Sequence, residues 1–161
     1  MLTPLRMEMC NYYILTCSDT EDIEGKRVPA LKVAKARLKI HAWPLYKNTR
    51  NRRAICPGDI CLIYLAGTSD YAQHLIAMAD VGAVSDYSRM DDPGDDSILS
   101  MGVPTSILQF KKITLFDTPS PIRPLLEVLS FTNTDGRSWG GSLQGGCRHI
   151  SYDDFRLIAG V

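Results

Sequence analysis

Apolar positions along the chain gather in short runs of strand length, separated by turn residues. Residues 12–16 (Tyr-Tyr-Ile-Leu-Thr) are aromatic and β-branched, as is typical of a strand. Residues 60–66 form a run without a polar alternation, which predicts a strand covered on both faces. Residues 73–84 and 106–116 are the next predicted strands, and 148–150 a last short one.

Turn residues predict how two of these strands pair. Pro57-Gly58-Asp59 is a turn sequence directly before the apolar run 60–66. Gly67 to Asp70 then turns the chain toward the strand predicted for 73–84. A connection this short predicts antiparallel pairing of the two strands.

Helical patterns occur between the predicted strands. Ser18 to Glu21 has the capping-box spacing that starts a short turn or helix. Pro29 is suited to the first position of a helix that runs to about Lys39. In this segment the apolar positions share one face and the lysines an adjacent face. The apolar set is Leu31, Ala34 and Leu38, and the lysines are Lys32, Lys35 and Lys39.

Two further helices are predicted near the end of the chain. A short helix is expected from Ser120-Pro121, with its apolar side chains inward: Ile122, Leu125, Leu126 and Leu129. Ser151 to Asp154 is a capping box for a final helix that ends at Gly160.

The order of these elements predicts the fold class. Strands and helices are mixed without regular βαβ alternation, and no internal repeat is visible. The class expected is therefore α+β, a partly open β-barrel of mixed strands flanked by short helices. Residues 1–10 read as a weakly structured lead-in, and 11–160 as a single domain.

Composition narrows the class of protein. The chain has 161 residues, of which 45% are hydrophobic and 22% charged, as in an ordinary globular domain. No apolar run approaches the ~20 residues of a membrane helix, and the start lacks a secretory layout. Five scattered cysteines without a C-x-x-C pair indicate buried thiols in a reducing compartment. We expect a soluble cytoplasmic protein that does not bind a membrane.

Charge is balanced overall but segregated along the chain. The 18 Lys and Arg equal the 18 Asp and Glu, yet ten of the cations lie between Lys26 and Arg53. No acidic residue lies between Gly25 and Gly58. A neutral protein with one strongly positive segment has a surface suited to an anion.

The sequence tests for common enzyme classes fail. The three histidines lack metalloprotease spacing, and no G-x-S-x-G elbow is present. Gly141 and Gly146 have the spacing of a phosphate-binding loop, but Cys147 and Arg148 replace its Lys and Ser/Thr. The acidic loop at 91–96 does not match a calcium-loop spacing. We therefore predict a non-enzymatic protein without a metal or other cofactor.

The most informative segment is 41–53, where aromatics, amides and cations are interleaved. Pro44 and the Asn/Thr content predict an irregular, exposed segment. Guanidinium groups bind phosphates, amides bind base edges, and aromatic rings stack on bases for roughly 1–3 kcal/mol each. The members of this cluster are Trp43, Tyr46, Lys47, Asn48, Arg50, Asn51, Arg52 and Arg53.

Other interpretations of single members remain open. Trp43 has the alternative role of a core tryptophan, and Arg52 that of a structural partner for Asp59 or Asp80. One of the two asparagines has the alternative role of a turn former.

The same region resembles a known family. Three segments are similar to the EVE domain of the PUA-like superfamily. They are Trp43-Pro-Leu-Tyr46, Asn48-Thr-Arg-Asn-Arg52, and Pro57-Gly58-Asp59 followed by Tyr64 and Ala66-Gly67. The last part of the chain resembles the end of that domain, through Ser138-Trp139-Gly140, Gln144-Gly145-Gly146, Ile150-Ser151 and Phe155 to Ile158. The resemblance spans about residues 11–159.

The resemblance implies a partly open barrel, related to YTH readers, that binds a flipped and often modified base in DNA. A modified cytosine is one such base. Under this hypothesis Trp43 and Trp139 form stacking walls, with Tyr46 and Tyr64 as further aromatic candidates. Asn48 or Asn51 reads the base edge. The other candidates for contact with the base are Ser18 and Ser138. The candidates for phosphate binding are Lys47, Arg50, Arg52 and Arg53. The glycines that would let the backbone approach the ligand are Gly140, Gly145 and Gly146.

Two alternatives stay open at this stage. One is an RNA-binding PUA-like domain that acts on transfer or ribosomal RNA. The other, from a different class, is a small metal-dependent hydrolase or nuclease. The base modification, the strand state and the oligomeric state are open as well.

Overall fold

The computed structural model of the chain describes residues 10–22, 24–87, 103–132, 143 and 145–160. Its order of elements is β1 Tyr12–Cys17, β2 Thr20–Glu21, β3 Arg27–Val28, α2 Ala30–Lys39, β4 Ala42–Leu45, β5 Ile60–Leu65, β6 His74–Asp86, β7 Ser106–Pro121, the 3₁₀ helix η2 Arg123–Leu125, β8 Cys147–Ile150 and α4 Tyr152–Ala159. Nearly all of the predicted lead-in, 1–10, lies outside the described residues.

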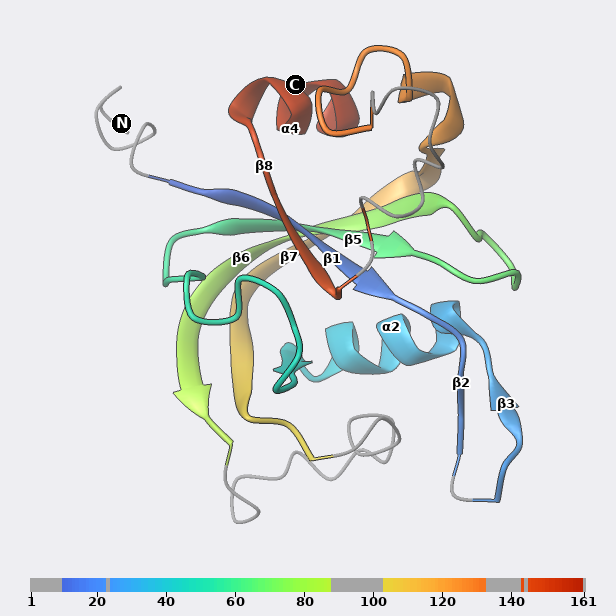
Figure 1. Ribbon diagram of the computed structural model, residues 1–161, viewed down its shortest axis with the longest axis vertical. Helices are drawn as coiled ribbons and strands as arrows, with labels where there is room; N and C mark the ends of the chain where they lie inside the picture. The colour runs from blue at the N-terminus through green and yellow to red at the C-terminus, as the bar shows by residue number, and fades with distance from the viewer. Residues whose placement is uncertain (1–9, 23, 88–102, 133–142, 144, 161) are drawn as a thin grey trace.

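Six strands form one mixed sheet in the order β4-β7-β6-β5-β1-β8, and β2 pairs separately with β3. Strand β1 runs parallel to β5, whereas β5 and β6 are antiparallel, as the short connection between them predicts. Figure 1 shows β6 and β7 curving past α2, with α4 on the other side of the crossing strands. The α+β half-barrel predicted from the order of elements is confirmed.

Both faces of the central strands are covered, which explains the unbroken apolar run at β5. On β1, Tyr13 and Leu15 point into a core that contains the buried side of α2. The alternate residues Tyr12 and Ile14 join a second core with α4, through residues such as Phe155. Two buried faces leave no room for a polar alternation along these strands.

Irregular pairing gives the sheet its curvature. The register between β6 and β7 shifts at three places, and that between β5 and β6 shifts once, between Ile63 and Tyr64. Bulges of this kind bend a strand and increase its twist. The long strands therefore wrap toward α2 instead of extending flat.

Three predicted elements differ from the structure. Residues 42–45 form the buried edge strand β4, although an exposed irregular segment was predicted there. Residues 42–45 become a strand because they pair with β7, and the local sequence does not predict this pairing. Thr20 and Glu21 form strand β2, not a helix. The helix predicted near 122–129 is reduced to a 3₁₀ turn and further turns, although Ile122 and Leu129 are buried as expected.

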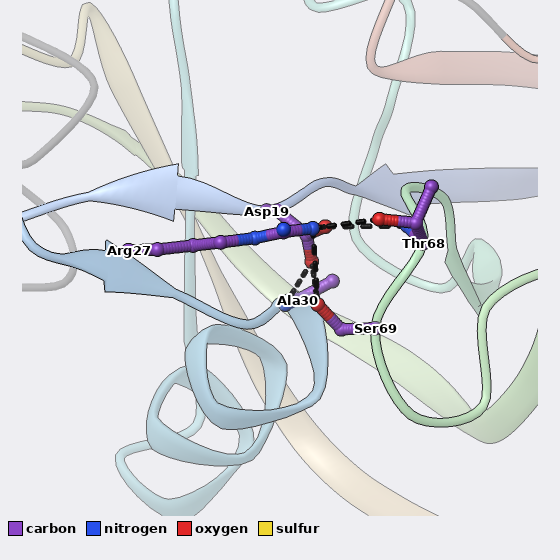
Figure 2. A network of polar contacts seen from close by, with 5 residues as sticks. All are labelled: Asp19, Arg27, Ala30, Thr68 and Ser69. Carbon is purple, nitrogen blue, oxygen red and sulfur yellow. Dashed lines mark hydrogen bonds and ion pairs between the residues drawn. The ribbon is translucent and has the colours of Figure 1, made fainter.

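Asp19 explains why the capping pattern after β1 does not start a helix there. Its carboxylate accepts a hydrogen bond from the backbone N–H of Ala30, the first residue of α2, at 2.8 Å. It also accepts from Thr68 N–H and from the Ser69 hydroxyl, and pairs with Arg27. Figure 2 shows this network. Asp19 therefore ties the start of a distant helix to the loop between β5 and β6.

Gly67 makes room for this carboxylate. Its φ is +88°, and a Cβ at this position would lie 2.6 Å from Asp19 Oδ2. Glycine is required on both counts, because other residues disfavour positive φ and the added carbon would clash.

Asp19 should give the protein a stability that depends on pH. Desolvation raises the pKa of Asp19, but the hydrogen bonds from Arg27, Ala30, Ser69 and Thr68 outweigh it and hold the pKa well below its usual range. The stabilisation is therefore complete above the unfolded pKa, about 4, and is lost as the pH falls through the folded value.

In Asp19→Asn we expect unfolding free energy at pH 7 to fall by about 1–2 kcal/mol, a modest value because Arg27 is largely exposed. Urea unfolding from pH 7 to pH 3 measures it, and the difference from wild type should shrink toward pH 3. Glu21→Gln, which changes an exposed carboxylate of the same hairpin, is the control. A pH-independent difference would contradict the assignment.

No helix in the described ranges has the length and apolar character needed to cross a membrane.

Candidate functional site

The loop that follows β4, residues 46–54, lies against the beginning of β8. The backbone N–H of Arg50 donates to the carbonyl of Gly145 at 2.9 Å. The side-chain amide of Asn51 donates to the carbonyl of Cys147 at 3.3 Å. The cation-rich loop is therefore held next to the glycine-rich end of the chain, as the hypothesis of a shared site requires.

Glycines allow this close approach. Gly145 has a φ of +95°, and a Cβ there would lie 2.7 Å from Arg50 Cδ. Gly146 has a φ of +81°, and its Cβ would lie 3.3 Å from Thr49 Cγ2. These glycines were predicted to let a ligand approach the backbone; in the structure they let the 46–54 loop approach it.

The loop also holds its own shape. Thr49 Oγ1 accepts a hydrogen bond from Tyr46 N–H at 2.9 Å, and Thr49 N–H donates to the Tyr46 carbonyl. Arg52 Nε donates to the Lys47 carbonyl at 3.2 Å. These local bonds fix the turn from which Arg50 and Asn51 extend.

A cleft of about 540 Å³ opens between this loop and β8. The described residues that line it are Arg50, Asn51, Cys147, Arg148 and His149. None of these five is acidic, and two are arginines. Burial raises the pKa of the Cys147 thiol to about 12, so it stays neutral at physiological pH. The described walls of the cleft thus combine positive charge with amide and imidazole hydrogen-bonding groups, a chemistry suited to a phosphate-bearing ligand.

Trp43, on β4, lies in the hydrophobic core. Its exposed fraction is 2%, and its ring packs near Phe110 and below the guanidinium of Arg37, which is 4.8 Å from the ring centroid. The expectation that the Trp43 indole forms a wall for a base is corrected, because neither ring face reaches the surface. The alternative interpretation, that Trp43 is a core tryptophan, agrees with the structure.

Tyr64 requires the same correction. It is 3% exposed on β5 and belongs to the core shared with α4. Burial raises the pKa of its phenol to about 12. In this structure the ring therefore has no exposed face on which a base could stack.

The other predicted site residues are distributed as follows. Tyr46 is partly exposed; desolvation raises its pKa, and the charge of Arg37 and a hydrogen bond from Arg37 oppose this rise. Lys47, Asn48 and Arg53 are exposed on the same loop as Arg50, and Ser18 is partly exposed after β1. Ser138, Trp139 and Gly140 lie outside the described residues.

Three of the described lining residues of the cleft were not predicted as site residues: Cys147, Arg148 and His149. Arg148 was considered only as a mismatch to a phosphate-binding loop. Its guanidinium lies over the Phe131 ring at 5.5 Å, and His149 contacts Tyr13 from the exposed edge strand. The available signal was an arginine and a histidine at the start of a predicted strand, one residue after the pair Gly145-Gly146.

Comparisons with known proteins give a fold. No protein-family profile matches the chain, and no curated protein sequence matches it. Among solved structures, a hypothetical protein from Leishmania major is similar with a TM-score of 0.56 and 17% identity over 94% of both chains. Human THYN1 in complex with DNA containing 5-methylcytosine has a TM-score of 0.54 and 9% identity, over 93% of this chain and 96% of THYN1.

The N-terminal domain of Staphylothermus marinus McrB is similar as well. Its TM-score is 0.51 with 9% identity, over 92% of this chain and 93% of that domain. These matches extend along almost the whole chain at low identity, so what they share with it is architecture. Together with the mixed half-barrel sheet, they show that this chain has a PUA-like fold.

Proposed function

We propose that the protein binds nucleic acid through the cleft between the 46–54 loop and β8. The observation that carries this proposal is the docking of Arg50 and Asn51 onto Gly145 and Cys147, which places two arginines around one opening. Arginine is the side chain best suited to bidentate phosphate contacts, and no described lining residue opposes it with negative charge.

We further propose that the chain is an EVE-type reader and that its ligand is DNA with a flipped, modified base. The segment motifs at 43–52, 57–67 and 144–146 support this, as does the likeness to the fold of THYN1, which was solved with 5-methylcytosine DNA. Because Trp43 and Tyr64 are buried, the described residues proposed to contact the base are Tyr46, Asn48, Asn51 and Ser18. The proposed phosphate contacts come from Lys47, Arg50, Arg52 and Arg53, and from Arg148, which lines the cleft.

Edge recognition and stacking must offset the few kcal/mol that base extraction costs. A single methyl contributes only about 0.8 kcal/mol through apolar contact. Preference for a modified base should therefore be modest unless a polar group, such as the Asn51 amide or the Ser18 hydroxyl, also contacts the modification.

A panel of labelled oligonucleotides tests both levels of the proposal. We expect binding whose log affinity falls linearly with log salt, with a slope of about −0.9 for each phosphate neutralised on duplex DNA. Fluorescence anisotropy compares three ligands of equal length: a duplex with 5-methylcytosine, a duplex with plain cytosine and a structured RNA. The comparison separates a DNA reader from an RNA-binding domain.

The outcomes are distinct. Tighter binding of the modified duplex supports the reader, and equal binding of modified and plain DNA contradicts base recognition but not nucleic-acid binding. Stronger binding of the RNA favours the alternative ligand. No salt-dependent binding to any of the three contradicts the proposed function itself.

A further inference from the structure

A second opening lies between α2 and the strands β6 and β7, and it shares none of its lining residues with the cleft beside Arg50. Its volume is about 570 Å³. The lining residues are mostly apolar: Leu31, Lys35, Leu38, Lys39, His41, Tyr71, Ile76, Ile113, Leu115, Phe116 and Pro119. We call this opening the α2 groove.

Large apolar side chains are exposed at the α2 groove. Leu115 is 63% exposed and Tyr71 is 50% exposed, among only six large hydrophobic residues recorded as exposed in the described ranges. Scattered exposed apolar residues are normal, but two that line one concave surface with Leu31 and Ile113 form a patch. Contact with another apolar group would remove this surface from water.

The charged side chains of the α2 groove have one sign. Lys35 and Lys39 lie one helical turn apart on α2 and are exposed. In the described part of the chain neither forms an ion pair, and no lining residue is acidic. His41 Nδ1 donates to the Phe110 carbonyl at 3.1 Å. Asp70 and Asp117 adjoin lining residues in the sequence but do not line the groove themselves.

These features define the chemistry of an occupant. The apolar floor requires aliphatic or aromatic side chains, and the pair of lysines requires carboxylates about one helical turn apart. A nucleic-acid backbone would satisfy the lysines, but it would leave Leu115 and Ile113 against phosphate and sugar. A peptide segment that carries both kinds of side chain satisfies both requirements.

We propose that the α2 groove binds an acidic amphipathic peptide segment of a partner protein. Apolar side chains of the segment pack on Leu38, Ile113 and Leu115, and its carboxylates pair with Lys35 and Lys39. This surface is separate from the proposed nucleic-acid cleft, so the protein would join a nucleic acid to a protein partner.

Fluorescence anisotropy with a labelled synthetic peptide, in which Leu and Phe alternate with Asp and Glu, tests the proposal. The same peptide with Asn and Gln in place of the acids is the ligand control. We expect saturable binding of the acidic peptide to the full chain. The double variant Lys35→Glu/Lys39→Glu should weaken it about tenfold or more, because attraction is replaced by repulsion.

Matched variants separate a groove from general attraction. Lys111→Glu/Lys112→Glu makes the same charge change at exposed positions of β7 outside the groove and should leave binding unchanged. Leu115→Ser should weaken binding, whereas Val128→Ser, at a similarly exposed apolar residue, should not.

Four results would overturn the proposal. The first is absence of saturable binding of the acidic peptide, and the second is equal weakening by the two lysine pairs. The third is that a duplex oligonucleotide displaces the peptide and that this displacement requires Lys35 and Lys39; the groove would then be a nucleic-acid surface. The fourth is dimerisation in sedimentation that Leu115→Ser abolishes, which would make the occupant a second copy of the chain. None of these depends on the Arg50 cleft.

Discussion

An Arg50→Glu variant is expected to lose most of its affinity for nucleic acid. Arg50 lines the cleft beside β8 and is fixed there by its backbone bond to Gly145. Reversal of its charge removes a charge-assisted phosphate contact and adds repulsion, so we expect a loss of about 10- to 100-fold at low salt. Fluorescence anisotropy with a duplex oligonucleotide measures this loss.

Controls separate charge from structure in this experiment. Arg50→Lys keeps the charge and should retain part of the affinity, because only the bidentate geometry is lost. Lys111→Glu makes an equal change of net charge on β7, outside the cleft, and should have little effect. Equal losses in Arg50→Glu and Lys111→Glu would mean that only net charge matters, which contradicts a localised site.

An Asp154→Ala variant is expected to lose about 3 kcal/mol of unfolding free energy. Asp154 is 3% exposed, and its carboxylate accepts hydrogen bonds from the backbone N–H of Ser130, at 2.9 Å, and from the Ser130 hydroxyl. Alanine leaves these donors without their acceptor beneath α4. The hydrogen-bonded link between Ser130 and the final helix would then be lost.

Urea unfolding monitored by circular dichroism measures this change. Asp153→Ala is the matched control, because Asp153 lies in the same first turn of α4 but is exposed. It loses only the favourable interaction with the helix dipole, so we expect a decrease of no more than about 0.5 kcal/mol. A similar loss in both variants would show that helix electrostatics, not the buried bonds to Ser130, explains the effect.

Prediction from sequence succeeded where a residue's environment is set by its neighbours in the chain. The apolar run at β5 requires two covered faces, and both are present. Ser151 caps α4 through a bond to Asp154 N–H, and Gly160 ends the helix with a φ of +73°. These patterns act over a few residues, so the local sequence contains the whole cause.

Prediction failed where the cause lies far away in the chain. Asp19 lies within the capping-box spacing Ser18 to Glu21, which predicts a helix start. In the structure it instead caps the helix that begins at Ala30 and binds the loop at Thr68 and Ser69. Trp43 stands in a segment with loop-forming residues, but pairing of β4 with β7 draws its indole into the core beside Arg37. Burial of this kind depends on which segment pairs with which, and the local composition does not specify that.

The sequence by itself determined the apolar strands, the two principal helices and the concentration of cations between Lys26 and Arg53. Only the tertiary structure decided which cations share a surface. Arg50, Arg148 and His149 line one cleft beside β8, while Lys35 and Lys39 border a separate apolar groove. The physical reason is that a pattern of period two or 3.6 fixes the face a residue occupies within its own element. Contacts across 96 residues, such as that of Asn51 with Cys147, arise only when the sheet closes and positive-φ glycines let two backbones approach.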